Sequence, residues 1–316
     1  MRGSHLKKHG LSILLVVVLS TAWAMVYFIH GALGAASWWF IQFFSIVGSF
    51  LALSVVCIMC WNIIKRRRFS FSLFVLFLLS LAAAWPICWF AGAMQLAYPA
   101  RLHQTKPSVS IRLPMNQPVL VGWGGDSLAT NYHAIAPNQR WVYDLLVPPA
   151  GIGSEKLEDY GIYGLDVVAP AAGIVVEAQS NEADHKPGAE TGGSMTGNHV
   201  YIKLDETGTY LVIAHLKQGS VRVMAGQHVD EGTFIAKAGN SGHSSEPHVH
   251  IHHQRQDPSK TNMFLAEGLP LYFRDIDGPA MPSGGMRLKE GKEVPVGDTI
   301  IPRSSGSTEE NRETIK

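Results

Sequence analysis

Hydrophobic residues are distributed unevenly along the chain, and the pattern changes at about residue 100. Three long apolar runs fill the first part, at about Leu11–Ile29, Trp38–Ile64 and Ser72–Tyr98. A helix of about 20 apolar residues crosses the hydrocarbon core of a bilayer, so each run is long enough to span a membrane. Pro86 lies within the third run, and transmembrane helices tolerate such a kink. The pattern therefore predicts a membrane anchor of three helices over residues 1–100.

The basic residues of this anchor predict its orientation. Arg2, Lys7 and Lys8 precede the first run, and the cluster Lys65–Arg68 separates the second run from the third. Because basic loops stay in the cytoplasm, both clusters are expected inside and the uncharged turn at about Gly31–Ser37 outside. The third helix then leads out of the cytoplasm. We therefore expect a multi-pass protein of the bacterial cytoplasmic membrane whose C-terminal part is extracytoplasmic.

The first apolar run has a second interpretation. The sequence Ala22-Trp23-Ala24 resembles the small-x-small pattern at which signal peptides are cleaved. Cleavage there would leave the predicted side of the C-terminal part unchanged, because the basic cluster between the second and third runs still fixes their orientation.

Charge and cysteine content exclude some functions for the part after Ala100. All 25 acidic residues lie there, with 19 of the 26 lysines and arginines, which gives a formal charge of −6. This balance argues against a nucleic-acid partner.

Cys57, Cys60 and Cys88 all lie in the apolar runs, so no disulfide is available to the exported part. We interpret the C-x-x-C of the second run as helix packing.

Short β-type runs separated by Gly, Pro and Asn follow a connector at residues 101–117, and no long amphipathic helix is found. We predict an all-β domain over residues 118–275 and a C-terminal extension over 276–316, which is disordered from about residue 302 because it is almost free of apolar residues. The long loops Pro148–Gly164 and Asn181–Gly197 could wall a groove. The predicted strands are Val119–Gly122, Trp141–Val147, Gly173–Ala178, His199–Leu204, Tyr210–Leu216, Thr233–Ala238 and His248–His252.

The last of these strands carries three histidines in alternate positions. Side chains two residues apart lie on the same face of a strand, so His248, His250 and His252 project to one side while Val249 and Ile251 pack on the other. Neutral imidazole is the commonest metal ligand in proteins, and a catalytic zinc takes three protein ligands and a water. An H-x-H pair by itself is weak evidence for a metal.

Several further motifs precede this strand in a fixed order. They are Ala214-His215-Leu216, the run from Val223 to Ala236 with glycines at 226 and 232, Gly239-Asn240-Ser241-Gly242 and Pro247-His248-Val249-His250. Together they resemble the lysostaphin or LytM-type family of zinc endopeptidases. The resemblance runs from His133 to His252 and implies an antiparallel sheet related to hybrid barrels over the domain at 118–275.

The resemblance also implies roles for five residues. His250 matches a metal ligand of the family, while His248 and His215 match its two catalytic histidines. His133 and Asp144 are our choice for the other two ligands of a single zinc ion, as in a variant with loops inserted around the aspartate strand. Three ligands would leave a fourth position for water, and the two catalytic histidines would hold that water and move protons. The sequence does not say which of them is the base.

Two positions depart from the family pattern. Gly164-Leu165-Asp166-Val167 mimics the usual aspartate strand, but Ile162 stands where the histidine is expected, so a site that used Asp166 would lack a ligand. His252 replaces a common carboxylate. It could orient His250, and we favour a solvated strand position instead. Surface or turn positions are expected for His185, His199, His228, His243 and His253, of which His243 is near enough to line the cleft.

The expected function is that of a membrane-anchored zinc metalloendopeptidase that cleaves peptidoglycan peptides in cell-wall remodelling. The three helices imply a lipid bilayer as partner. The sequence indicates neither a protein partner nor which peptide bond is cleaved. A non-catalytic regulatory or binding module of cell-wall enzymes and a protease of exported proteins are the alternatives. A carrier domain of lipoyl type is not favoured, since no lysine stands at an exposed hairpin tip.

Overall fold

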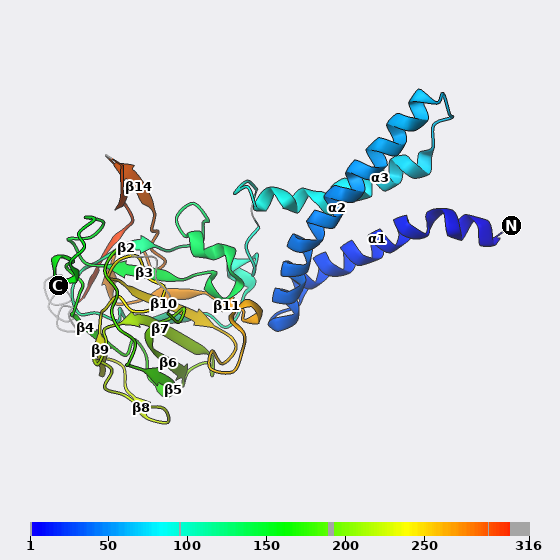
Figure 1. The fold of residues 1–316 in the computed structure, drawn as a ribbon. Coiled ribbons are helices and arrows are strands. Elements are labelled where there is room, and N and C mark those ends of the chain that lie inside the picture. Colours follow the sequence, from blue (N-terminus) through cyan, green and yellow to red (C-terminus); the bar gives the residue numbers. More distant parts are fainter. Residues whose placement is uncertain (1, 95, 189–192, 290, 304–316) are drawn as a thin grey trace, which may run out of the picture. The chain divides into compact units, whose positions relative to one another are not determined.

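The computed structural model describes residues 2–94, 96–188, 193–289 and 291–303 (Figure 1). The chain divides into two compact units, Met1–Ala100 and Arg101–Lys316. Each unit is described by itself.

The N-terminal unit consists of helices, as its apolar runs predict. In the described part of the chain, three helices are long and apolar enough to cross a membrane. They are α1 (Arg2–Phe28), α2 (Ala32–Ile64) and α3 (Phe71–Ala84), the last of which continues as a 3-10 helix, η1 (Trp85–Trp89).

Two boundaries of this unit differ from the sequence-based prediction. The third helix was expected to reach Tyr98, but its α-helical part ends at Ala84, two residues before Pro86, which lacks an amide hydrogen and crowds the preceding turn. The chain leaves helical structure after Trp89. The turn predicted at Gly31–Ser37 is also shorter, since α2 already begins at Ala32 after a glycine with a φ of 79°.

Aromatic side chains hold the segment after η1 against the start of α2. The indole of Trp38 donates a hydrogen bond of 2.8 Å to the carbonyl of Leu96, and the Tyr98 hydroxyl donates one of 3.0 Å to the carbonyl of Ile29. Trp38 also stacks on Trp89, with 6.2 Å between the ring centroids. These contacts explain why the last apolar residues of the third run are buried without being helical.

An antiparallel sheet of ten strands forms the main body of the C-terminal unit, which confirms the predicted fold class. All the predicted strands are present, as β2, β3, β5, β6, β7, β9 and β10. The strand order is β13-β16-β2-β3-β10-β7-β6-β5-β8, and β11 also pairs with β10. The bounds are β2 (Val119–Trp123), β3 (Tyr143–Leu146), β5 (Gly173–Gln179), β6 (Asn198–Leu204), β7 (Tyr210–Leu216), β8 (His228–Val229), β10 (Val249–Gln254), β11 (Gly268–Leu269), β13 (Ile276–Asp277) and β16 (Thr299–Pro302).

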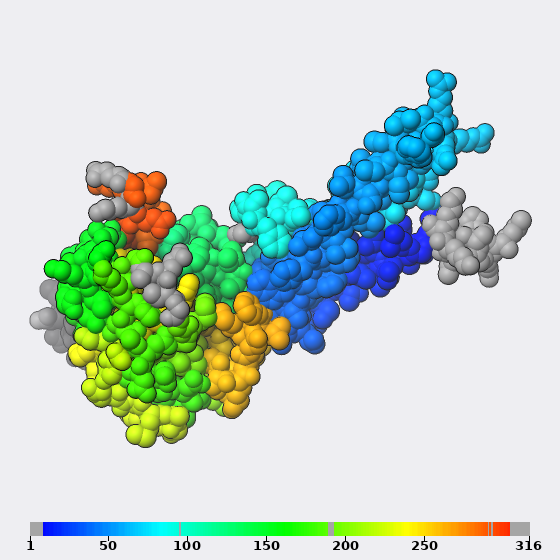
Figure 2. Space-filling model, in the orientation of Figure 1, coloured from blue at the N-terminus to red at the C-terminus, as the bar shows by residue number. Residues whose placement is uncertain are grey.

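Among the described residues, this unit also contains three small two-stranded sheets. The hairpin of β14 and β15 stands out from the surface of the unit (Figure 2). The pairs are β1 (Val109–Ile111) with β12 (Leu271–Phe273), β4 (Asp166–Val168) with β9 (Phe234–Lys237), and β14 (Met286–Lys289) with β15 (Lys292–Pro295).

The hydrophobic core lies on one face of the central strands. Val249 and Ile251 of β10 are fully buried in it, together with Tyr143 and Leu145 of β3. Because side chains alternate along a strand, the residues between them point to the opposite face. That face is where β3 and β10 present their polar side chains.

The C-terminal extension contributes to this sheet. β16 pairs with β2, and its residue Ile300 is fully buried in the core. The segment after residue 275 is thus partly a structural component of the sheet. The predicted disorder from about residue 302 concerns mainly residues 304–316, which lie outside the described residues.

Candidate metal centre and cleft

The centre is built on two neighbouring strands, β3 and β10. Asp144 of β3 is the direct antiparallel partner of His250 of β10, so both side chains project from the same face of the sheet. The Nδ1 atom of His250 lies 2.9 Å from Oδ1 of Asp144. Both residues are buried, with exposed fractions of 3% and 6%. Strand pairing therefore brings together two residues that are 106 positions apart.

His133 reaches the same carboxylate from a short 3-10 helix, η3 (Tyr132–Ile135). Its Nε2 atom lies 2.8 Å from Oδ2 of Asp144, and its Nδ1 atom lies 2.9 Å from Oε1 of Gln139. The buried amide of Asn131 donates to the carbonyl of Gly125 at 3.1 Å and so ties down the start of η3. The loop between β2 and β3 thus folds back over the sheet.

Three donor atoms converge at this point, one each from His133, Asp144 and His250, and all lie within 4.8 Å of one another. Burial by itself would raise the pKa of the Asp144 carboxyl. The neighbouring His133 and His248 imidazoles, and the close approach of the His133 and His250 ring nitrogens, lower that pKa well below its usual value instead. The carboxylate is therefore ionised, and burial lowers the pKa of His250, which keeps this imidazole neutral.

A β-bulge directs His215 to this face. Asn198 of β6 pairs with Leu216 of β7 while Val200 pairs with Ile213, so β7 holds one extra residue there. His215 has a φ of 60°, which is uncommon for a residue with a side chain. Regular alternation would send His215 to the core side with Ile213. The bulge sends Leu216 there instead and leaves the histidine beside His250, with 5.6 Å between the ring centroids.

His248 stands opposite His215, with 4.7 Å between the ring centroids. Its Nδ1 donates to the carbonyl of Glu246 at 2.8 Å, and Nδ1 of His215 donates to the carbonyl of Ser241 at 2.9 Å. Each bond leaves the Nε2 atom with a lone pair, and Nε2 of His248 lies 3.7 Å from Oδ1 of Asp144. Burial lowers the pKa of His215 well below its usual value, so this ring is neutral.

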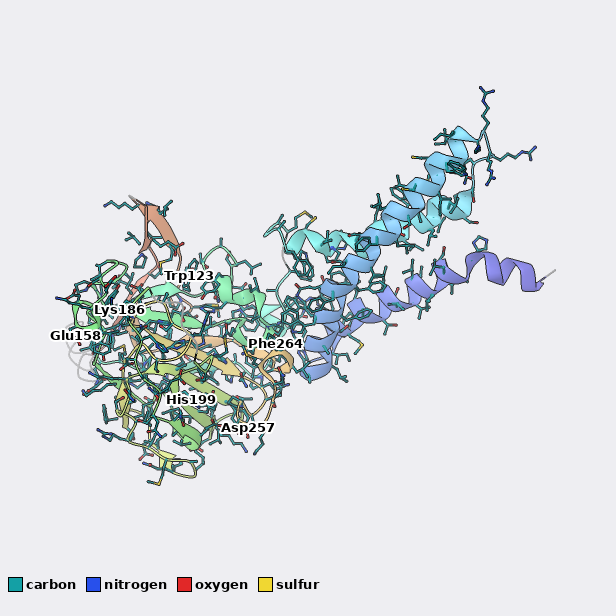
Figure 3. The ribbon with its side chains drawn as sticks, viewed as in Figure 1. Trp123, Glu158, Lys186, His199, Asp257 and Phe264 are labelled. Atoms are coloured by element: carbon teal, nitrogen blue, oxygen red, sulfur yellow. The ribbon has the colours of Figure 1, made fainter. Side chains whose placement is uncertain are left out.

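A cleft opens above these residues. One side is apolar, since Trp123 at the end of β2 (labelled in Figure 3) packs edge-on against Tyr132, whose ring stacks on His133. The opposite side is polar. The cleft is lined by Gly122, Trp123, Tyr132, His133, Asp144, Leu146, His215, His243, Ser244, Ser245, Glu246, His248 and Met286.

The two long loops that could have walled a groove contribute none of the described lining residues. Both loops instead form hydrogen bonds with residues of the site. The amide of Gly151, in the first loop, donates to the carboxylate of Glu246 at 2.9 Å. The carbonyl of Thr196, in the second loop, accepts a bond from the amide of His215.

Asp166, the rival of Asp144, lies on another pair of strands. It begins β4, which pairs with β9, and its carboxylate forms an ion pair of 2.5 Å with Lys237. Its side chain is 58% exposed. Among the described residues it joins no group of potential metal ligands.

Our expectations for several other histidines were wrong. His252 was expected to be solvated but is 3% exposed, and its Nδ1 lies 3.0 Å from Nε2 of His250. His199 and His253 were expected in surface or turn positions but are buried within β6 and β10. Both histidines pack against polar partners that were not visible in the local pattern, His199 against Tyr201 and His253 against Thr209. His243 lines the cleft, as expected.

The residues that sequence analysis missed are Tyr132, Glu246 and Met286. Tyr132 directly precedes His133 and Glu246 lies two residues before His248, so proximity to the motifs was an available signal. Met286 lies far outside the motifs, and only the folding of the C-terminal segment onto β2 brings it to the cleft.

Comparison with known families agrees with the motifs. Residues 159–262 match the model of peptidase family M23. The match contains His215, His248 and His250, whereas His133 and Asp144 precede it. No curated protein matches the chain.

Similar solved structures include several peptidases. A peptidase M23 from Pseudomonas aeruginosa is 20% identical, with a TM-score of 0.28, and the match covers 51% of this chain and 54% of that one. The catalytic domain of lysostaphin from Staphylococcus simulans is 20% identical, with a TM-score of 0.28 and coverages of 46% and 84%. A zinc-containing peptidase from Vibrio cholerae is 19% identical, with a TM-score of 0.30 and coverages of 46% and 36%. The chain thus spans about half the length of the first of these.

The antiparallel sheet and its histidine-lined cleft agree with the fold that the motifs led us to expect for the C-terminal unit. The match of residues 159–262 to the model of peptidase family M23 confirms the resemblance that the motifs indicated.

Proposed function

We propose that the C-terminal unit is a zinc endopeptidase that hydrolyses peptide bonds of peptidoglycan outside the cytoplasm, and that the three helices anchor it in the cytoplasmic membrane. The observation that carries this proposal is the convergence of His133, Asp144 and His250 beside a cleft that is lined by His133, Asp144, His215 and His248. Two imidazoles and a carboxylate are a frequent ligand set of catalytic zinc.

The hydrogen bonds around His133 support a cation between these ligands. The Oε1 atom of Gln139 can only accept, so Nδ1 of His133 carries the proton and its Nε2 atom has a lone pair. This lone pair faces Oδ2 of the ionised Asp144 carboxylate at 2.8 Å. Two acceptors at that distance repel each other unless a positive charge lies between them. The donor set therefore fits a zinc ion held by His133, Asp144 and His250.

Zinc bound there would act as a Lewis acid toward a peptide carbonyl and would lower the pKa of water. His215 and His248 would supply the proton transfers, because both present Nε2 lone pairs to the cleft while their Nδ1 protons are committed to backbone carbonyls. Each ring can accept a proton from water and later donate it to the leaving amine. The bonds to the carbonyls of Ser241 and Glu246 hold the proton on Nδ1 of each ring, while Nε2 takes up and releases a proton.

The apolar side of the cleft could hold the peptide. Trp123, Tyr132 and Met286 line the same cleft as His133, where they can pack on a substrate side chain or backbone. One basic cluster precedes the first span and another, at residues 65–68, follows the second, and both favour a cytoplasmic position. The third span then crosses to the outside, which gives this cleft an outer position.

The proposal is tested with the full-length chain purified in detergent. Zinc content is measured by metal analysis, and digestion of purified sacculi is compared with cleavage of a panel of soluble peptides. We expect about one zinc per chain and release of peptide fragments from sacculi. Zinc binding without digestion of either substrate would favour a regulatory module, and cleavage of soluble peptides alone would favour a protease of exported proteins.

A further inference from the structure

A buried chain of hydrogen bonds extends from His250 away from the cleft. Nε2 of His250 lies 3.0 Å from Nδ1 of His252, and Nε2 of His252 lies 3.1 Å from Oε1 of Gln254. The amide nitrogen of Gln254 donates to the backbone carbonyl of Gln256 at 2.7 Å. His250, His252 and Gln254 are each at most 3% exposed. They occupy alternate positions of β10 and therefore share one face of the sheet.

The direction of every bond in this chain follows from its far end. A backbone carbonyl can only accept, so the group of Gln254 that faces Gln256 is its NH₂ and the group that faces His252 is its oxygen. That oxygen requires a proton on Nε2 of His252, whose Nδ1 atom then has a lone pair. The lone pair accepts a proton from Nε2 of His250.

We infer that His252 and Gln254 are positioning residues that fix the tautomer of His250, so that its Nδ1 lone pair faces the metal position beside Asp144. A neutral imidazole with its proton on Nε2 has a lone pair only on Nδ1, and this atom lies 2.9 Å from Oδ1 of Asp144. In the opposite tautomer the proton on Nδ1 would bind the carboxylate and block the ligand atom. The chain therefore keeps His250 ready for a metal.

This inference goes beyond the proposed function and rests on it in one respect, since it takes His250 to be a zinc ligand. Removal of the hydrogen-bond partner of a metal-bound histidine typically lowers the metal affinity by about 10- to 100-fold. His252→Phe keeps a ring in the buried site but removes the acceptor for Nε2 of His250. His252→Asn keeps an acceptor oxygen close to the position of Nδ1.

The neighbouring residue provides a matched control. His253 is also a buried histidine of β10, but its ring binds Thr209 and the carbonyl of Pro270 rather than the chain described above. His253→Phe therefore removes a buried imidazole from the same strand without touching His250. It reports how much a change of this size affects the fold alone.

Zinc dissociation constants of the full-length chain in detergent are measured by competition with a chelator at one fixed pH. We expect His252→Phe to weaken zinc binding by about 10- to 100-fold, and His252→Asn and His253→Phe to bind as the unmodified chain does. Should His252→Phe fail to fold, Gln254→Met interrupts the same chain one step further away and is expected to weaken binding in the same direction. Unchanged affinity in the folded variant would overturn the inference.

The tautomer itself is read from ¹⁵N spectra of histidine-labelled, zinc-free protein. We expect His250 to carry its proton on Nε2 in the unmodified chain and to become a mixture of tautomers in His252→Phe. A proton on Nδ1 in the unmodified chain refutes the inference. If the unmodified chain binds no zinc, the proposed function fails, and the spectra still decide whether His252 and Gln254 set the tautomer of His250.

Discussion

At the scale of single residues, the site depends on positions that break local rules. His215 has a positive φ inside a strand, and a backbone conformation of this kind costs about 1–3 kcal/mol unless the surrounding structure enforces it. Asp144 is a charged group with an exposed fraction of 6%, compensated by imidazoles on several sides. Such exceptions to regular packing are typical of functional sites.

The choice between the two aspartates gives a first prediction. Asp144→Ala removes the carboxylate on which His133 and His250 converge, whereas Asp166→Ala removes an exposed partner of Lys237. We expect Asp144→Ala to lose bound zinc and Asp166→Ala to keep it, as measured by metal analysis of the purified chains. Loss of zinc only in Asp166→Ala would reverse our assignment.

The two remaining histidines give a second prediction. His215→Ala and His248→Ala leave the three proposed zinc ligands in place but remove a group that moves protons. We expect each variant to retain zinc and to lose about 10²- to 10⁴-fold in hydrolysis rate, the usual contribution of general acid–base catalysis. Either variant with full activity on sacculi would exclude that residue from the mechanism.

A third prediction concerns pH and the buried histidine at position 253. Burial lowers the pKa of His253 from 6.5 to about 4. Below pH 6.5, His253 is therefore protonated in the unfolded chain but stays neutral in the folded chain. The free energy of unfolding falls as the pH drops from 6.5 toward 4. At about 1.4 kcal/mol per unit of pKa shift, the loss from this residue is about 3 kcal/mol.

His253→Gln should flatten the dependence of thermal unfolding on pH between 4 and 6.5. His228 serves as the control, because it is exposed and its hydrogen bond to the Asp205 carboxylate raises its pKa, which gives an effect of opposite sign. An unchanged pH profile in His253→Gln, relative to His228→Gln, would show that position 253 is not the buried neutral group described above.

At the scale of elements, the strand order decides where the site lies. β10 is flanked by β3 and β7, so the carriers of Asp144, His250 and His215 are three adjacent strands. The pairing of β16 with β2 adds a further strand on the side of β3. The C-terminal segment therefore supports the strand next to the one that carries Asp144.

β16 gives a fourth prediction, with two neighbouring isoleucines as test and control. Ile300 is fully buried in the core, whereas Ile301 is 44% exposed. We expect Ile300→Ala to lower the free energy of unfolding by about 2–5 kcal/mol, since it leaves a cavity, and Ile301→Ala to change it by about 0.5 kcal/mol or less. Equal effects in a denaturant titration would mean that β16 does not pack as described.

At the scale of the whole molecule, the helical unit and the sheet unit differ in what they need from their surroundings. The helices expose many large apolar side chains, among them Phe28, Phe50 and Ile63, each at least 68% exposed in the absence of lipid. Such surfaces are stable in a bilayer. The C-terminal unit instead buries apolar residues in a main core of its own and in a smaller cluster around Tyr201.

The proposed sidedness gives a fifth prediction. In a chain with Cys57, Cys60 and Cys88 replaced by Ser, a single cysteine at Gln218 tests the C-terminal unit and one at Arg67 tests the basic cluster. A membrane-impermeant maleimide added to intact spheroplasts should label Gln218→Cys and spare Arg67→Cys until the membrane is opened. The reverse pattern would place the cleft in the cytoplasm.

The sequence by itself determined the three apolar spans, the β character of the rest and the face on which the histidines of β10 lie. These features depend on composition and on the period of two along a strand, both of which are local. The motifs indicated a resemblance to a peptidase family before any fold was known, because their order along the chain is specific.

Only the tertiary structure decided which distant residues meet. The pairing of β3 with β10 places Asp144 against His250, the loop from β2 returns His133 to them, and a bulge directs His215 to the same face. The burial of His252 was also decided at this level, since a strand residue cannot report locally whether its face is covered by solvent or by neighbouring chain. Strand adjacency and register are long-range properties, and no local pattern in this sequence contains them.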